Sequence, residues 1–134
     1  MENINKNYIK CNSFLIGASF NMPVFEGPRT VTANMVDYIE NIKITDNLIE
    51  MIVERQVEFS PKTPHIVAKF QATLETQSPI SKTQFISDVK TGLPILNAAF
   101  ARVSLAIANM SSLSNFGPII FIPAYDPKRV VIKD

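Results

Sequence analysis

Few side chains in this sequence could take part in chemistry. It contains one histidine, His65, and one cysteine, Cys11, and a thiol next to an imidazole is the smallest set that could act as nucleophile and base. His65 follows a proline-rich turn and Cys11 begins an expected strand, so nothing in the sequence brings the two side chains together. A zinc site needs about four His, Cys or carboxylate ligands at recognisable spacing, and the sequence has no such set. We therefore predict no catalytic residue and no metal ligand.

The glycines argue against the common nucleotide-binding loops. The sequence has four of them, and they are scattered at Gly17, Gly27, Gly92 and Gly117. A phosphate loop or a dinucleotide-binding turn needs several glycines within a few residues. We predict no cofactor and no enzymatic activity.

The charges also narrow the class of partner. Thirteen Lys and Arg residues balance twelve Asp and Glu residues, for a formal net charge of +1. A protein that follows nucleic-acid phosphates usually carries a basic excess, so we expect no nucleic-acid partner. Residues 93–110 are apolar but are interrupted by Asn97, Arg102, Ser104 and Asn109, which indicates an amphipathic helix and not a membrane span. The polar N-terminus lacks a signal-peptide pattern, and a single cysteine fits a reducing compartment, so we expect a cytoplasmic protein.

The clearest predicted elements are two strands joined by the turn at residues 61–64. Apolar and polar residues alternate over 48–59 and again over 66–74, which is typical of an antiparallel hairpin with one solvated face. Arg55 is the one charged residue on the apolar side of this hairpin. The polar side carries carboxylates that could act as acid and base, but a solvated sheet face explains them better; they are Glu50, Glu54, Glu58 and Glu75.

The remaining segments give weaker patterns. Residues 11–22 predict a strand whose even positions are buried, from Phe14 to Met22, and residues 30–45 predict a loosely formed crossing segment that ends in a short strand. A short helix or irregular turn should end at Gly92. A longer helix should then run from Pro94 to about Ser112, because apolar residues recur there at three- and four-residue steps. An extended apolar run is predicted at 119–122, and the ends at about 1–10 and 127–134 should fray.

This order of segments resembles SecB, the bacterial export chaperone. The resemblance rests on residues 93–102, on the helix through Ser112, and on the apolar run with its following proline, Pro123. In that family a similar helix begins with a proline and an apolar cluster, carries an alanine–arginine step like Ala101-Arg102, and ends in a glycine-containing turn before an apolar segment. The resemblance covers roughly residues 11–125.

The resemblance implies a single α+β domain over residues 1–134, with a four-stranded antiparallel sheet backed by one long helix. The family's second C-terminal helix should be lacking, because Asp126-Pro127 and a short basic tail leave no room for it. It also implies homodimers or homotetramers that hold unfolded polypeptides in apolar grooves near the crossing segment. Contact with the translocation motor is not expected from a near-neutral chain. The residues that correspond to such a groove are Val24, Phe25, Met35, Tyr38, Ile120, Phe121 and Tyr125.

Two functions remain open at this level. The first is an ATP-independent chaperone that holds unfolded or extended polypeptides, with protein export as a pathway that the resemblance implies. The second is a dedicated interaction or assembly module that uses the same fold to bind one folded partner. Both require apolar surface beyond the core, and the alanine-rich face of the long helix and the run at 119–122 predict an oligomer.

Overall fold

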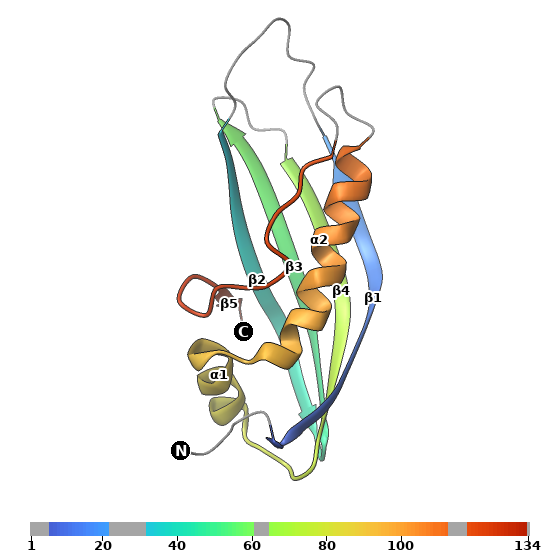
Figure 1. Ribbon diagram of the computed structural model, residues 1–134. Helices are drawn as coiled ribbons and strands as arrows, with labels where there is room; N and C mark the ends of the chain where they lie inside the picture. The colour runs from blue at the N-terminus through green and yellow to red at the C-terminus, as the bar shows by residue number, and fades with distance from the viewer. Residues whose placement is uncertain (1–5, 22–31, 61–64, 113–117, 134) are drawn as a thin grey trace, which may run out of the picture.

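A computed structural model describes residues 6–21, 32–60, 65–112 and 118–133 of the chain. Most of the secondary structure is a long, twisted sheet with one long helix against it (Figure 1). In chain order the elements are β1 (Tyr8–Phe20), β2 (Thr32–Thr45), β3 (Leu48–Ser60), β4 (His65–Thr76), α1 (Lys82–Thr91), the 3-10 turn η2 (Pro94–Leu96), α2 (Asn97–Ser111) and β5 (Val131–Lys133).

Among the described residues, the sheet has five strands in the order β1-β4-β3-β2-β5. The first three pairings are antiparallel, whereas β5 lies parallel to β2. The α+β class is therefore confirmed, but the prediction of a four-stranded antiparallel sheet is wrong. The additional strand comes from the tail that was expected to fray. It is held because Val130 is buried at its start, Ile132 packs against the core, and the Lys133 ammonium lies 4.0 Å from the centre of the Tyr38 ring.

The hairpin of β3 and β4 has the predicted alternation. Odd-numbered side chains of β3 and even-numbered side chains of β4 are buried beneath α2, and we call this side the helix-covered face. The opposite side is the outer face. Of its four predicted solvated carboxylates, Glu58 and Glu75 are exposed, Glu50 is half-buried, and Glu54 is buried in an ion pair at 3.5 Å from the Lys69 ammonium.

Each of the two strands beside the hairpin contains a β-bulge that the alternation did not predict. In β1 the register with β4 shifts between Leu15 and Gly17, so Phe14 lies on the outer face while Ala18 and Phe20 lie on the helix-covered face. The single buried face expected for the even positions of this strand is therefore wrong. Phe14, Leu15 and Ile16 are each about half exposed, at 58%, 51% and 45%.

The crossing segment predicted at 30–45 is instead a regular strand of 14 residues. Its register with β3 shifts between Glu40 and Lys43, and Asn41 has a left-handed φ of 54°. A bulge of this kind adds one residue and reverses which parity faces the core. Asp37 and Ile39 before it and Ile42 and Ile44 after it therefore all lie on the helix-covered face, which blurred the alternation in the sequence.

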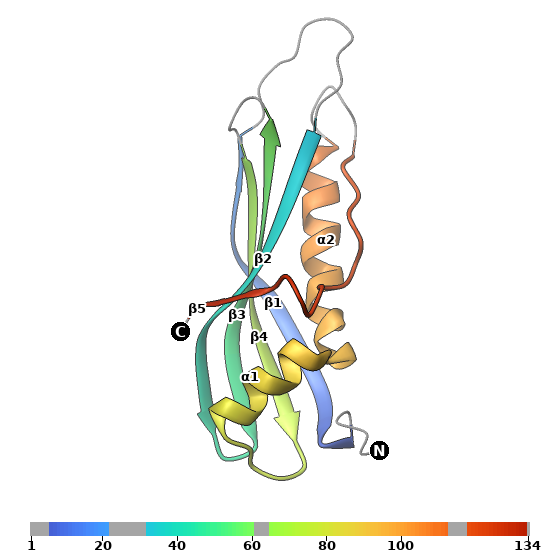
Figure 2. The ribbon, with the colours of Figure 1, turned by 90° about the vertical axis from the view of Figure 1, so that its left-hand side faces the viewer.

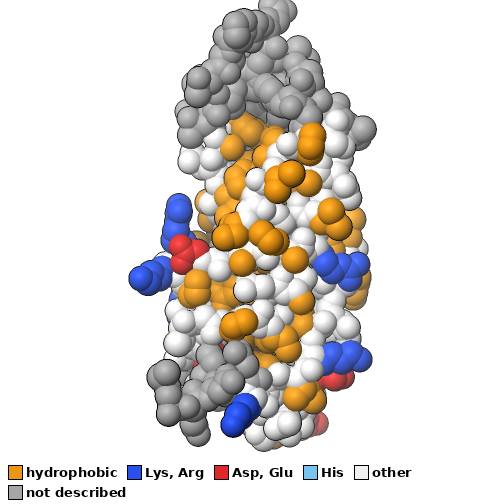
Figure 3. All heavy atoms as spheres, viewed as in Figure 1, with side chains coloured by type: hydrophobic (Ala, Val, Ile, Leu, Met, Phe, Trp, Pro, Cys, Tyr) orange, Lys and Arg blue, Asp and Glu red, His pale blue; other side chains and the backbone are white. Residues whose placement is uncertain are grey.

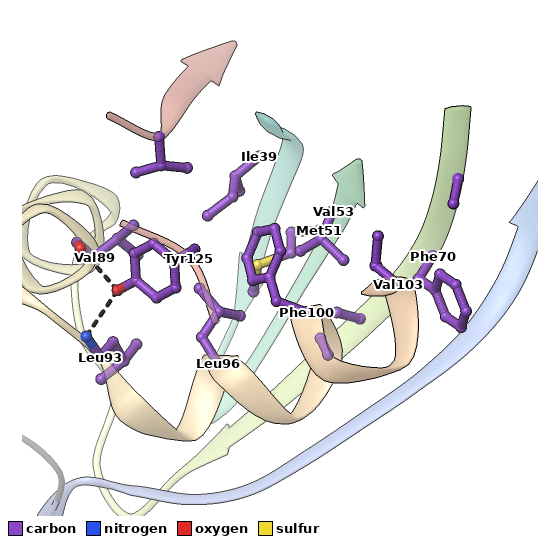
Figure 4. Close-up of a cluster of buried hydrophobic side chains, with 14 of the residues drawn as sticks. Ile39, Met51, Val53, Phe70, Val89, Leu93, Leu96, Phe100, Val103 and Tyr125 are labelled. Carbon is purple, nitrogen blue, oxygen red and sulfur yellow. Dashed lines mark hydrogen bonds between the residues drawn. The ribbon is translucent and has the colours of Figure 1, made fainter. Parts of the chain in front are cut away.

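The core lies between the helix-covered face and the two helices (Figure 4). On α2 the buried side chains include Phe100, Val103 and Ile107, at the predicted three- and four-residue steps. α1 begins at Ser81, whose hydroxyl accepts a hydrogen bond from the Gln84 N–H, and it ends at Gly92 with φ 125°. The chain then turns by 83° into η2 and α2, which places α1 across the lower end of the sheet (Figure 2).

The described residues that follow Pro118 contain no helix up to Lys133, as the sequence predicted. No single helix in the described part of the chain is long and apolar enough to cross a membrane; only the bent pair Lys82–Thr91 and Pro94–Ser111 meets the length and composition test together.

Candidate functional site

The residues predicted to line a groove do not form one surface. Val24 and Phe25 lie outside the described residues. Met35, Ile120 and Phe121 lie on the helix-covered side of the molecule, with Ile120 78% exposed and the other two partly buried. Tyr38 lies on the outer face of the sheet, and Tyr125 lies in the core.

Tyr38 lies on the outer face. It pairs with Glu54, one residue along β2 from the Asp37–Arg55 pair of the helix-covered face, and its ring contacts Lys133 of β5. The prediction that Tyr38 shares a surface with Ile120 and Phe121 is therefore wrong, because a strand turns successive side chains to opposite faces.

Tyr125 belongs to the core. It is 6% exposed, and its ring centre lies 5.4 Å from that of Phe100. Its hydroxyl donates a hydrogen bond to the Val89 carbonyl at 2.8 Å and accepts one from the Leu93 N–H at 2.7 Å (Figure 4). The phenol thus joins the end of α1 to the start of η2, and burial raises its pKa.

The run predicted at 119–122 is part of a longer extended segment held between α2 and the sheet. We call residues 118–125 the docked segment. Three polar residues of α2 hold its backbone, and they recur every seven residues on one side of the helix. The Ser111 hydroxyl accepts from the Ile119 N–H at 2.6 Å, the Ser104 hydroxyl donates to the Phe121 carbonyl at 2.9 Å, and the Asn97 side chain accepts from the Tyr125 N–H at 3.2 Å.

From the other side, Arg55 of β3 holds the same segment. The Arg55 side chain is completely buried and forms a two-pronged ion pair with Asp37 of β2, with N–O distances of 2.7 and 2.9 Å. Its two terminal nitrogens also donate to the carbonyls of Ile122 and Ala124 at 2.8 and 2.9 Å. The charged residue that interrupted the apolar face of β3 in the sequence is therefore the link between the sheet and the docked segment.

Because these bonds use the backbone, apolar side chains of the docked segment stay in solvent. Ile120 is 78% exposed and Ile122 is 65% exposed. Between this segment and β2 lies a hollow of about 410 Å³, lined by Met35, Ile122, Ala124, Tyr125, Asp126, Pro127 and Arg129. Figure 3 shows that this side of the molecule is largely apolar, with charged side chains mainly at its margins. The surface is suited to an apolar chain and not to an ion.

The groups that could catalyse a reaction are kept apart. Cys11 pairs with Leu74 at one end of β4 and His65 begins the other end, so nine strand positions, roughly 30 Å, separate them. Burial raises the pKa of the Cys11 thiol, which makes it a poorer nucleophile. Within the described ranges no three His, Cys, Asp or Glu side chains cluster in a way that could hold a metal ion.

Comparison with known proteins shows a likeness in structure alone. No protein-family model matches the sequence, and no curated protein matches it. Among solved structures, the fold is similar to that of the SecB-like chaperone Rv1957 of Mycobacterium tuberculosis, in complex with a ChAD peptide from the HigA1 antitoxin Rv1956. The TM-score is 0.59 at 10% identity, over 82% of this chain and 84% of that one. This chain has a SecB-like fold.

The SecB-like fold supports the overall arrangement inferred from the sequence, but the residues that hold the docked segment were missed. Asn97 and Ser104 were interpreted only as interruptions of an apolar helix, and Ser111 was not singled out. Their seven-residue spacing is close to two helical turns, and such a polar line along an apolar helix was a signal that something polar, here a strand of backbone, lies against it.

Proposed function

We propose that this protein is an ATP-independent chaperone that holds unfolded or extended polypeptides on the apolar surface around the docked segment. The observation that carries the proposal is the exposure of two isoleucines, Ile120 and Ile122, of which Ile122 lines the Met35 hollow. Both lie on a segment whose backbone is held by five hydrogen bonds with Arg55, Asn97, Ser104 and Ser111. Because the backbone of this segment is already fixed, its exposed apolar side chains can bind a partner with little further loss of conformational entropy.

The structural likeness adds support of a second kind. The SecB-like chaperone of similar fold was solved with a peptide from another protein, so the fold is compatible with peptide binding. The sequence has no basic excess, and the described ranges contain no single apolar helix of membrane length, so nucleic acid and bilayers are not proposed as partners. The cytoplasm is the proposed site of action.

We also propose that the protein is a homodimer or a homotetramer. β1 is an edge strand with no neighbour on one side in the described chain, and its Ile9, Phe14, Leu15 and Ile16 are each 45–58% exposed. A long, apolar sheet edge is prone to pair with another chain. A second copy at this edge would cover apolar surface that the protomer leaves in water.

The proposed chaperone activity is tested by suppression of aggregation. A chemically unfolded test enzyme is diluted into buffer with and without near-stoichiometric amounts of this protein, and light scattering is followed. We expect the double variant Ile120→Ser, Ile122→Ser to bind the unfolded enzyme about 5- to 150-fold more weakly, equivalent to roughly 1–3 kcal/mol, with little loss of stability.

The matched control is Leu48→Ser. Leu48 is an exposed apolar residue, 36% accessible, at the β2–β3 turn and away from the docked segment, and its replacement should leave client binding unchanged. Failure to suppress aggregation of several different clients would contradict the proposal. Equal effects of the control and the double variant would show that the binding surface lies elsewhere.

The alternative is an interaction or assembly module that binds one folded partner through the same surface. The two functions differ in selectivity, since a chaperone holds many unfolded clients whereas a module should retain one stoichiometric partner and ignore unfolded chains. Purification of the full chain with its bound proteins, followed by stoichiometry measurement, separates them.

A further inference from the structure

The sheet has a second free edge, and it lies beside the docked segment. β2 pairs with β3 along nearly its whole length but with β5 only at Tyr38, Ile39 and Glu40. Among the described residues no strand pairs with positions 33–36 on this side (Figure 2). Within the described chain, the backbone N–H and C=O groups that point outward there have no strand partner.

This free stretch lacks the usual protection of an edge strand. Natural edges are often blocked by lysine or proline or by a bulge. Residues 33–36 are Ala, Asn, Met and Val, and the bulge of β2 lies farther along, between Glu40 and Lys43. The edge therefore remains open to pairing.

The chain itself demonstrates what this edge accepts. β5 is a three-residue extended segment added in parallel to β2, with Ile132 toward the core and Val131 and Lys133 toward the outer face. Its docking uses backbone pairing together with one inward apolar side chain. A further extended segment along the same edge would repeat this arrangement at positions 33–36.

The space beside the edge has the shape and chemistry for such a segment. Met35 lines both the 410 Å³ hollow under Ile122 and a smaller recess of about 120 Å³ that reaches Asp37 and Val130. A strand at the edge would turn every second side chain toward this apolar space and the others away from it. Among the described residues that line the hollow, the charges are one of each sign, Asp126 and Arg129, so a neutral, apolar segment fits best.

From these observations we propose that the β2 edge at residues 33–36 binds an extended apolar segment of the client by strand addition, with β5 filling the adjoining part of the same edge. The inference rests on the proposed chaperone function and adds that the client's backbone is recognised, and not its side chains alone. Four residues span about 13 Å of strand, so one site binds only a short segment of the client.

A second copy of this chain is the less suitable occupant of this edge. β5 already fills the middle of it, and a paired copy would bring its own turn at 126–130 and its own docked segment into the same narrow space. β1 has 13 residues and no described strand beside it on the side away from β4, so it offers a copy a longer edge instead.

The test compares a peptide with two backbone-modified versions of itself. The probe is a fluorescein-labelled peptide of alternating valine and threonine with phenylalanine near its centre, and its binding to the full chain is measured by fluorescence anisotropy. In the two analogues, every second amide is N-methylated, on one parity in the first and on the other parity in the second. Only one parity of a strand bonds to its neighbour, so one analogue should bind at least about tenfold more weakly and the other nearly as well as the parent.

Amide hydrogen exchange locates the site in the same samples. Peptide binding should slow exchange within residues 33–36 of β2. Equal binding of both analogues, or protection that appears on β1 and not on β2, would overturn strand addition at this edge while suppression of aggregation still supports the chaperone function. Protection of residues 33–36 that rises with protein concentration alone would show a second copy there and would also overturn it. If the peptide does not bind and no client is protected from aggregation, the proposed function itself fails.

Discussion

Arg55 lies at the centre of an apolar sheet face, and its four side-chain hydrogen bonds to described residues go to two places. Two go to Asp37 and two go to carbonyls of the docked segment. A guanidinium is planar and presents several donors in fixed directions, so it can bind a carboxylate and a strand at once. A lysine could not make this set of contacts. The sequence identified Arg55 as an exception, but its partners, 18 and 67 or more positions away, follow only from the folded chain.

Removal of Arg55 alone should be strongly destabilising. Arg55→Met leaves the Asp37 carboxylate buried without its partner, and we expect a loss of about 3–5 kcal/mol in the free energy of unfolding, measured by urea denaturation. The double variant Arg55→Met, Asp37→Leu should recover most of this stability because neither charge remains. Its docked segment should still be loosened, with faster amide exchange at Ile119 and Tyr125. A single variant as stable as the original protein would refute this account.

Two buried phenols predict loss of stability in alkali. Burial raises the pKa of Tyr8, helped by its 2.6 Å hydrogen bond to the Asp88 carboxylate and by that charge, and burial also raises the pKa of Tyr125. The unfolded chain releases these protons near pH 10, whereas the native protein keeps them. The contribution of these phenols to the free energy of unfolding is therefore fully present below about pH 10. Above that pH it falls by up to about 1.4 kcal/mol per pH unit for each phenol.

The measurement is urea denaturation over a series of alkaline pH values. Tyr8→Phe and Tyr125→Phe should each lower stability at neutral pH, by about 1–3 kcal/mol for the buried groups left unpaired, and each should make the alkaline decline less steep. A slope that is the same in both variants and in the original protein would contradict this explanation.

At the scale of the elements, the sequence predicted the strands and the helix whose hydrophobic pattern is uninterrupted. β3, β4 and α2 follow their alternation or their three- and four-residue steps from end to end, and their positions were confirmed. β1 and β2 each contain a bulge, which moves one half of the strand out of phase with the other, so a single alternation could not describe them. β5 has only three residues, and its pairing with β2 depends on tertiary contacts that no local pattern encodes.

The same reasoning explains the outcome for the candidate site. The extended run that contains Ile120 was predicted because an apolar segment that cannot be helical has to lie extended, whereas a binding role for Ile120 stays a prediction. Tyr38 was misassigned because the parity of β2 could not be followed through its bulge. Tyr125 was misassigned because an aromatic residue with a polar tip can serve a surface or a core, and only its partners, Val89 and Leu93, decide between them.

Two glycine variants test whether the corner between α1 and α2 depends on Gly92. Gly92 has φ 125°, and a Cβ there would lie 3.6 Å from Pro127, which is ordinary contact. The expected cost of Gly92→Ala is therefore backbone strain of about 1–3 kcal/mol. Gly17→Ala is the control, since a Cβ there meets nothing within 4 Å, and it should change the free energy of unfolding by less than about 0.5 kcal/mol. Equal effects in urea denaturation would show that the corner does not depend on this glycine.

At the scale of the whole molecule, the two edges of the sheet differ. The β1 edge is long and apolar on both faces, whereas the β2 edge is short, partly filled by β5, and set beside a hollow. A protein with two open edges risks uncontrolled polymerisation unless each has its own occupant. Our proposals assign a second copy to the first edge and a client to the second.

Size-exclusion chromatography with light scattering tests the first assignment. We expect the mass of a dimer or a tetramer, and a shift to monomer for the double variant Phe14→Glu, Ile16→Glu, which places charges on the β1 edge. Leu105→Glu is the matched variant on the alanine-rich side of α2, where Leu105 is 62% exposed; it should leave the mass unchanged. If it alone dissociates the oligomer, the helix face is the interface. A strict monomer at tens of micromolar would count against both proposed functions.

The ion pair and hydrogen bonds of Arg55 predict how firmly the docked segment is held at different temperatures. The cost of removing charged groups from water falls as temperature rises, while hydrophobic stabilisation levels off, so the Arg55–Asp37 pair should hold the docked segment relatively better in warm conditions than in cold. The coupling energy of the two residues, from a double-mutant cycle at several temperatures, should therefore grow on warming; a decrease would contradict this. Heat also unfolds the clients that the proposed chaperone function requires, and under those conditions this protein's own apolar surface should be the part that stays in place.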